Sequence, residues 1–488
     1  MTHHHLCSAT RQLLTRRDIL THTGLGIGGL GLATLLHQTG FAKDQTESPL
    51  AARQPHFAPR AKRVIQIFAA GGPSQVDTFD PKPMLAKHDG KVIDEVVKDY
   101  AKQVYSQAKG VVGNPRLGGK LKGSPFKFEK HGQCGMEISE LFPQLATHAD
   151  ELCVIRSMQT IFTEHHFAAY MMLTGDAINS RPSIGAWTVY GLGAENQNLP
   201  AFVSLDKRGP VGNDRGYGSA FLPSWAAGTC IPTNDPSVEK MIENVRSGTT
   251  SFREQRRQLD QLREMHERFA AKHPGQKILD GRIEAFETAF RMQAEAADVF
   301  DIAREPKHIR DLYGDGQQGR DFLLARRLVE HGVRFVQVMH HGWDSHDRND
   351  EEHRKLTAEC DQPLHALLTD LKQRDMLKDT LVIWGGEFGR TPNVDNNTPA
   401  AKKSIGRDHH PFGFTLWMAG GGAKPGTVYG TTDEFGGLAV DNVVGIHDLH
   451  ATILHLLGFD HERLTYRFGG RDFRLTDVHG NVVKELVA

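Results

Sequence analysis

Cysteine is scarce in this chain, and neither sign of charge is in excess. The 488 residues include five cysteines, and those after Cys7 are widely spaced, without a C-x-x-C metal pattern or a haem attachment motif. Their disulfide pairing stays open. The 58 basic and 59 acidic residues give a formal net charge of −1, which provides no field to hold nucleic acid or anionic lipid. We therefore exclude both as partners.

A long apolar run is also missing. The apolar stretch at residues 24–36 is short and glycine-rich, so no stable membrane span of roughly 20 residues is expected. It follows Arg16-Arg17 and precedes a small-residue site near Ala42, which is the order of regions in a twin-arginine signal peptide. We interpret residues 1–42 as such a leader, so the chain is expected to be periplasmic or otherwise exported. This route carries folded cargo, often with a cofactor, which favours a metal or prosthetic group.

Short apolar runs recur after a polar linker at residues 43–60. They predict strands at 64–69, 154–155, 202–205, 333–339, 381–384 and 414–418. Helical patterns separate most of them, so we expect an α/β domain over residues 61–488. Its mostly parallel central sheet is covered by helices on both faces. Charged, helix-forming sequence at about 236–331 predicts a helical insertion or a flanking helical layer.

Polar residues follow several of these strands, at the edge where open parallel sheets bind ligands. After the first strand come Gly71 and Gly72, then Ser74 and Asp77, which we predict to bind substrate. Capping of a turn or helix explains the same two side chains and stays open as the alternative.

The strand at 333–339 is followed by the sharpest cluster, with His341, Asp344 and His346 within six residues. A divalent metal prefers this mixture of neutral nitrogen and anionic oxygen donors, so we predict all three as metal ligands. Glu387 and Arg390 lie on the glycine-rich loop after the strand at 381–384. The carboxylate is predicted to hold metal and the guanidinium to bind a tetrahedral oxyanion. A buried Glu–Arg pair that holds the loop is the alternative.

Two further histidine-bearing segments complete the prediction. Asp408, His409 and His410 lie in a loop before the last strand, and we predict them as metal ligands. His165 and His166 precede an apolar helix, whose N-terminal end attracts anions, and we predict them as catalytic residues.

Together with Arg16-Arg17, the segments 71–82, 341–346, 386–392 and 406–411 resemble an exported family known as domain of unknown function 1501. The resemblance extends to residues 468–473. That family is grouped with the alkaline phosphatase and sulfatase superfamily, whose members act on phosphate and sulfate esters at one or two metal ions. The resemblance therefore implies an alkaline phosphatase-like fold. Members are often encoded beside large exported cytochrome-like proteins, which implies such a partner.

The superfamily pattern fits this chain incompletely. His165 falls where the sulfatase nucleophile would lie, and Thr163 is the nearest hydroxyl, because the chain has no cysteine there to become formylglycine. The metal-binding Asp of the superfamily's first strand falls at Ala69 or Ala70. A single metal site from the seven predicted ligands remains.

The first hypothesis from the sequence is a metal-dependent hydrolase of phosphate or sulfate esters, acting on a small molecule or a polysaccharide. Zinc, calcium or manganese would be bound, Arg390 would steady the oxyanion, and either His165 or a metal-bound water would attack. The alternative is a non-catalytic metal- or ligand-binding module of an exported complex, because a fold alone does not establish activity.

Overall fold

The computed structural model describes residues 50–108, 110, 112–113, 117–206, 213–242, 251–272, 290–291, 296–395 and 406–488. The predicted leader lies outside these residues. The chain divides into two compact units, Met1–Ser48 with Thr250–Glu287 and Pro49–Thr249 with Thr288–Ala488. The described helix of the first unit is α9 (Phe252–Lys272). The central sheet and the candidate site belong to the second unit.

A nine-stranded sheet forms the centre of this unit, in the order β12-β4-β11-β8-β1-β7-β5-β6, with β15 beside β4. Its strands are β1 (Arg63–Ala70), β4 (Leu152–Gln159), β5 (Phe202–Leu205), β6 (Thr229–Ile231), β7 (Phe335–His341), β8 (Thr380–Gly385), β11 (Phe414–Ala419), β12 (Thr427–Tyr429) and β15 (Val444–Gly445). β11 pairs antiparallel with β4 and β8. The other pairs described in this sheet are parallel. The predicted fold class is confirmed, and six strands lie where the apolar runs predicted them.

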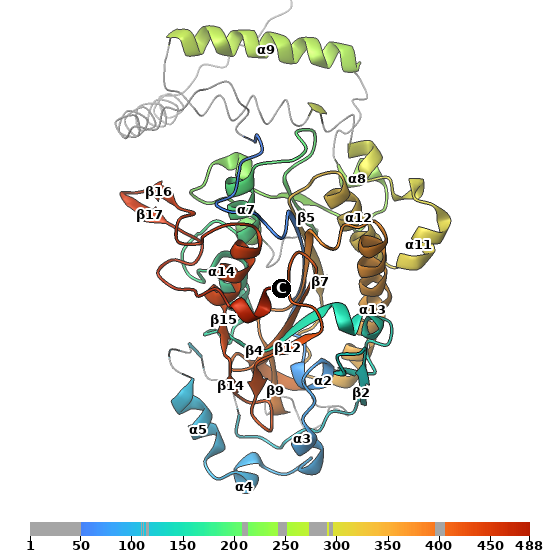
Figure 1. Cartoon of the computed structure of the whole chain (residues 1–488), viewed down its shortest axis with the longest axis vertical. Helices are drawn as coiled ribbons and strands as arrows, with labels where there is room; N and C mark the ends of the chain where they lie inside the picture. Colours follow the sequence, from blue (N-terminus) through green and yellow to red (C-terminus); the bar gives the residue numbers. More distant parts are fainter. Residues whose placement is uncertain are drawn as a thin grey trace, which may run out of the picture. The chain divides into compact units, whose positions relative to one another are not determined.

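Helices cover both faces of the sheet. Along β1, Ile65 and Ile67 face one hydrophobic cluster while Val64 and Phe68 face another, because successive strand side chains point to opposite faces. On the first face pack α12 (Gln317–Glu330) and α13 (Asn349–Gln373); on the second pack α6 (His165–Thr174), α7 (Ile184–Leu192) and α14 (Ile446–Leu456). The two layers lie on either side of the strands in Figure 1.

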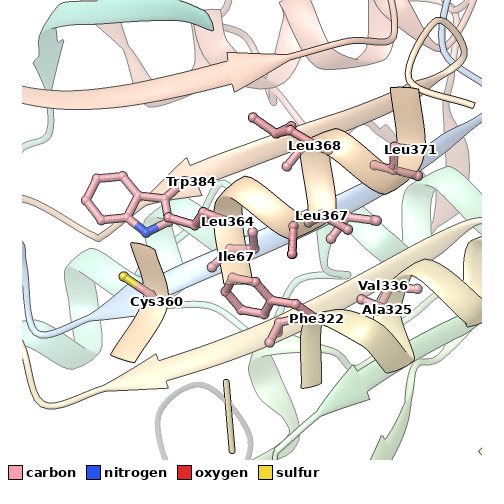
Figure 2. Close-up of a cluster of buried hydrophobic side chains, with 14 of the residues drawn as sticks. Ile67, Phe322, Ala325, Val336, Cys360, Leu364, Leu367, Leu368, Leu371 and Trp384 are labelled. Carbon is pink, nitrogen blue, oxygen red and sulfur yellow. The ribbon is translucent and has the colours of Figure 1, made fainter. Parts of the chain in front are cut away.

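Figure 2 shows the first of these clusters, where leucines of α13 and Phe322 of α12 meet Ile67 of β1 and Val336 of β7. These side chains are fully buried, so each contributes about 1.5–3 kcal/mol relative to an exposed position. The predicted insertion at 236–331 thus includes α12, which belongs to the central core. Of the helices that the structure describes, none combines the length and apolar character needed to cross a bilayer.

The remaining elements are short. The other helices are α2 (Gln75–Thr78), α3 (Pro83–Lys87), α4 (Ile93–Val96), α5 (Tyr100–Gln107), α8 (Val238–Met241) and α11 (Lys307–Tyr313), with 3₁₀ turns η1 (Leu145–Glu151), η2 (Asp214–Gly216), η3 (Ser224–Ala226), η4 (Ile302–Arg304) and η5 (Lys484–Leu486). Four antiparallel pairs join β2 (Phe128–His131) to β3 (Met136–Ser139), β9 (Gly389–Val394) to β10 (Arg407–His410), β13 (Thr431–Thr432) to β14 (Ala439–Asp441) and β16 (Tyr466–Phe468) to β17 (Arg471–Phe473).

Part of the predicted linker, from Pro49 onward, belongs to this unit and is hydrogen-bonded within it. The amide of Arg53 donates to the carbonyl of Leu192 at 2.8 Å, and that of Phe57 donates to Gly458 at 3.1 Å. Among the cysteines, Cys153 and Cys360 are buried free thiols, and Cys134 is an exposed one.

One buried histidine makes stability depend on pH. His450 of α14 donates its Nε2 proton to the carbonyl of Met172 at 2.7 Å, and burial lowers its pKa to about 3. An unfolded histidine takes up a proton below about pH 6.5. Between about pH 6.5 and 3 the unfolded chain therefore binds the extra proton, so the contribution of His450 to stability is constant above this window and falls as the pH drops through it.

On the acid side, the free energy of unfolding falls as the pH drops. We expect His450→Gln, whose amide can still donate to Met172, to make this slope shallower by about 1.4 kcal/mol per pH unit. Urea unfolding at pH 4.5 and 7.5 measures it. The control is His308→Gln, at an exposed position of α11, which should leave the slope unchanged. An unaltered slope in the His450 variant would show that this site takes up its proton without unfolding.

Candidate metal centre

The candidate centre lies beyond the carboxyl ends of β1, β7 and β8. In the sheet register Ala70 is paired with His341, and Phe68 with Gly385, so these strands end at one edge. Gly71 follows β1 with φ +114°, and a Cβ there would lie 2.4 Å from the amide nitrogen of Asp344. Only glycine therefore lets the loop after β1 lie directly against the loop after β7.

Three imidazoles converge on one carboxylate oxygen. The Nε2 atoms of His165 and His346 lie 3.1 Å from Asp344 Oδ1, and Nε2 of His409 lies 3.2 Å from it. The Nε2 atoms of His346 and His409 are 2.9 Å apart. The histidines come from the first residue of α6, the loop after β7 and the strand β10. Two overlapping ligand sets result, His165–Asp344–His409 and His346–Asp408–His409, with all ligand atoms of a set within 4.8 Å.

The opposite nitrogen of each ring fixes its orientation. The Nδ1 atoms lie against oxygens that only accept: Glu387 Oε1 at 2.6 Å for His165, Asp395 Oδ2 at 3.0 Å for His346, and the Thr163 carbonyl at 2.6 Å for His409. Each Nδ1 must therefore carry the proton that it donates, which leaves the Nε2 lone pair directed at the centre. Metal-ligating histidines are held in this way by carboxylates and carbonyls.

The pKa values of these imidazoles and of Asp344 are shifted because the groups lie so close together. Burial alone would lower the pKa of His165, but its hydrogen bonds with Asp344 and Glu387 outweigh burial and raise the pKa to about 9. Burial likewise opposes ionisation of Asp344, yet hydrogen bonds from the three histidines hold its pKa far below the usual range. The hydrogen bond to Asp344 raises the pKa of His346, whereas burial lowers that of His409.

This donor set fits a divalent cation. Three neutral nitrogens and a carboxylate oxygen are a common ligand set for such ions. In the absence of a cation, three lone pairs would face one carboxylate oxygen, and protons must fill the space between them. A bound divalent cation would take the place of these protons.

A family model described as "Protein of unknown function (DUF1501)" matches residues 61–487. The chain belongs to this family. No curated protein matches the sequence of this DUF1501 member.

Solved structures with a similar course of the chain belong to the alkaline phosphatase superfamily. One is a protein of that superfamily from Vibrio parahaemolyticus, with a TM-score of 0.36, 11% identity, and coverage of 88% of this chain and 75% of that one. Another is the sulfatase PsFucS1 from Pseudoalteromonas sp., with a TM-score of 0.35, 12% identity, and coverage of 83% of this chain and 69% of that one. A third is the alkaline phosphatase of the Antarctic bacterium TAB5, with a TM-score of 0.32, 10% identity, and coverage of 83% of this chain and 100% of that one. At this level of identity none of them assigns a role to a residue of the DUF1501 chain.

One predicted ligand, Glu387, lies behind the centre and contacts it through an imidazole, whereas Asp408 belongs to the second ligand set. Glu387 is 2% exposed and accepts from the Gly71 amide as well as from His165 Nδ1, so it positions an imidazole. Asp408 accepts from the His409 amide at 2.8 Å and lies 3.8 Å from Nδ1 of His346.

Arg390 is fully buried beneath the centre. It donates to the carbonyls of Gly71, Gly72 and Arg407, and its Nη2 lies 2.7 Å from Asp344 Oδ1. The guanidinium thus joins the loops after β1 and β7 and holds Asp344, and its donors are directed at protein oxygens.

Several predicted site residues of this DUF1501 chain lie away from the centre. His341 pairs with Asp206 at 3.2 Å, and the exposed His166 contacts Glu164 at 2.8 Å. Glu164 also accepts the amides of His166 and Phe167, so these donors of α6 are already used. His410 is buried beside Phe412, and burial lowers its pKa to about 3.

Ser74 and Asp77 form a buried network. Ser74 Oγ donates to Asp77 Oδ2 at 2.6 Å, and Arg407 Nε donates to the same oxygen at 2.8 Å. Asn349 also donates to it at 3.0 Å. Burial disfavours ionisation of Asp77, but the Arg407 charge holds its pKa below the ordinary range. Both residues join α2 to β10. Ser74 is the N-cap residue of α2, but its side chain makes no capping hydrogen bond there, so the structure does not bear out the capping alternative, and substrate binding by Ser74 and Asp77 stays a prediction.

Two functional groups were missed in the sequence. Asp395 and the carbonyl of Thr163 orient His346 and His409, yet neither belongs to a recognisable motif. One feature of the sequence could have pointed to Asp395. It follows directly after β9, the strand that continues from the Gly-Glu-Phe-Gly-Arg loop.

The positioning role of Glu387 leads to a prediction. We expect Glu387→Gln to weaken metal binding by about 10–100-fold, because loss of the charged acceptor makes His165 a poorer and less ordered ligand. Calorimetric titration of the metal-free chain with Zn²⁺ measures it. Glu359→Gln is the matched control, since Glu359 contacts His340 outside the centre, at 3.4 Å. Equal affinities in the two variants would contradict the role of Glu387.

Proposed function

We propose that this chain is an exported, metal-dependent hydrolase of phosphate or sulfate esters. One observation supports the proposal above all others: three Nε2 atoms lie within 3.2 Å of a single carboxylate oxygen, each with its Nδ1 on an acceptor. A scaffold needs no such arrangement.

The proposed ligands are His165, Asp344, His346 and His409. Three nitrogen donors favour zinc or manganese over calcium, which takes oxygen ligands. When bound, such an ion polarises an ester oxygen and lowers the pKa of a coordinated water to about 7.

The residues around the centre hold and orient the proposed ligands and shield them from water. Phe388 is buried beneath the centre, with its ring centroid 4.9 Å from that of His165 and 4.6 Å from that of His409, so it excludes water from below. Arg390 neutralises part of the Asp344 charge from inside the fold. His346 lies between Asp344 and Asp395, so its Nδ1 proton stays on the side away from the substrate.

A second candidate is a metal-binding module without turnover. The observation in its favour concerns the nearby hydroxyls. Thr163 donates to the Val112 carbonyl at 3.5 Å and Thr391 to that of Asn393 at 2.9 Å. Within the described residues, neither hydroxyl is presented as a nucleophile, so hydrolysis would require direct attack by water.

Elemental analysis and turnover of one sample separate the two candidates. Protein from the exported fraction should contain about one zinc or manganese per chain and hydrolyse an aryl phosphate or an aryl sulfate. Chelation should abolish turnover, and the metal should restore it. Stoichiometric metal without turnover of either ester would support the module, whereas a metal-free chain that rejects added ions would contradict both.

A further inference from the structure

Two of the proposed ligands flank one buried serine. Asp344 and His346 meet at the candidate centre, whereas Ser345 between them is 2% exposed. The Ser345 hydroxyl donates to Oδ1 of Asn349, the first residue of α13, at 2.8 Å. Ser345 therefore points into the fold at the place where the chain presents both ligands to the centre.

The main chain of Ser345 contacts the segment that carries His409. Its carbonyl accepts from the amide of Arg407, the first residue of β10, at 3.3 Å. A Cβ at Gly406 would lie 2.2 Å from the same carbonyl oxygen, so the two segments lie directly against each other. A displacement of Ser345 would thus move the ligands on either side of it relative to His409.

The amide group of Asn349 has one orientation that satisfies its neighbours. Its Nδ2 donates to Asp77 Oδ2 at 3.0 Å, and that carboxylate is ionised and only accepts. Oδ1 must therefore face Ser345, whose hydroxyl must donate. The carbonyl of Asn349 accepts from Nδ1 of His353 at 3.0 Å, since Nε2 of that ring accepts from the Ser74 amide. Asn349 is fully buried, and both its side chain and its main chain are fixed.

We propose that Ser345 and Asn349 form a positioning pair, which holds Asp344 and His346 at the distance from His409 that metal binding requires. The inference rests on the metal binding of the proposed function. Both residues act through the backbone, because their side chains are hydrogen-bonded to each other beneath the ligands. Outer partners that hold a ligand side chain directly change metal affinity by about 10–100-fold, so we expect this pair to contribute about tenfold.

Titration with Zn²⁺ of Ser345→Ala, Asn349→Ala and the double variant tests the pair. Each single change should weaken Zn²⁺ binding about tenfold, and the double change should weaken it no further, because the two residues act as one unit. The absorption bands of the Co²⁺-loaded chain should shift in the same variants, since these bands depend on the geometry of the ligands.

Ser204→Ala is the matched control. Ser204 Oγ in β5 donates to Gln337 Oε1 in β7 at 3.2 Å, and both residues are fully buried. This variant loses the same kind of hydrogen bond away from the ligands. Its resistance to urea should therefore fall as in Ser345→Ala, while its Zn²⁺ affinity and Co²⁺ spectrum stay those of the wild type.

The outcomes are distinguishable. Wild-type Zn²⁺ affinity in Ser345→Ala would overturn the positioning role and leave the proposed function in place. Equal weakening in Ser204→Ala would also overturn it, because any loosening of the fold would then suffice. Additive losses in the double variant would show that the two residues do not act as a pair. Failure of the wild type to bind Zn²⁺ would contradict the proposed function itself.

Discussion

Replacing His165 by alanine is expected to release the metal, while His166→Ala retains it. The two histidines are adjacent, but only His165 directs Nε2 at Asp344, whereas His166 contacts the exposed Glu164. Loss of a ligand should weaken binding by about a thousand-fold or more, beyond the 10–100-fold of an orienting partner. Ester turnover should fall with it.

Metal content and thermal unfolding with and without Zn²⁺ measure this effect. A ligand present at 100 times its Kd stabilises the folded state by about 2.7 kcal/mol, and His165→Ala should lose this gain. His165→Gln is the second variant, because its amide can still satisfy the buried Glu387. Full metal content in both His165 variants would place the metal elsewhere.

Asp77→Ala is expected to destabilise the fold by about 3–5 kcal/mol, because it leaves the Arg407 charge buried without its partner. The Asp77 and Arg407 side chains are both fully buried, 2.8 Å apart. Asp472→Ala is the matched control, since its pair with Arg467 has a similar length of 3.0 Å but is exposed on both sides. An exposed pair contributes at most about 1 kcal/mol.

Urea unfolding at constant pH gives both values. A small loss in Asp77→Ala with a raised KM would instead support the sequence prediction that Asp77 binds substrate. A large loss with unchanged metal affinity would assign Asp77 to the fold. Equal losses in Asp77→Ala and Asp472→Ala would contradict the distinction between buried and exposed pairs.

Strand positions and the edge that carries the histidines follow from the sequence, because apolar runs ending in polar loops specify both. Runs such as 64–69 and 381–384 are buried on both faces and so are continuous rather than alternating. The short strands β6, β12 and β15 lacked such a signal, since two or three residues form no periodic pattern.

The sequence could not show which of two neighbouring histidines faces the centre, and the reason is geometric. His409 and His410 are adjacent on β10, so one faces the centre and the next points into the core. Without a predicted strand there, both appeared as ligands. On α6 the equivalent choice depends on the start of the helix, and a shift of one residue would exchange His165 and His166.

Arg390 shows a different limit of prediction from the sequence. A guanidinium after a strand suits an oxyanion. Only when the loops are placed does it become visible that four carbonyls, that of Trp343 included, and Asp344 accept hydrogen bonds from Arg390. The alternative of a buried Glu–Arg pair was also incomplete, because the arginine holds Asp344 rather than Glu387.

The ligands lie far apart along the chain, which bears on the order of assembly during folding. His165, Asp344 and His409 meet only when α6, the loop after β7 and β10 have all docked. Contacts of such high sequence separation form late, because loop closure must precede them. If the centre binds a metal as proposed, metal capture during refolding would report a finished tertiary structure, and its rate would follow the slowest docking step rather than ion diffusion.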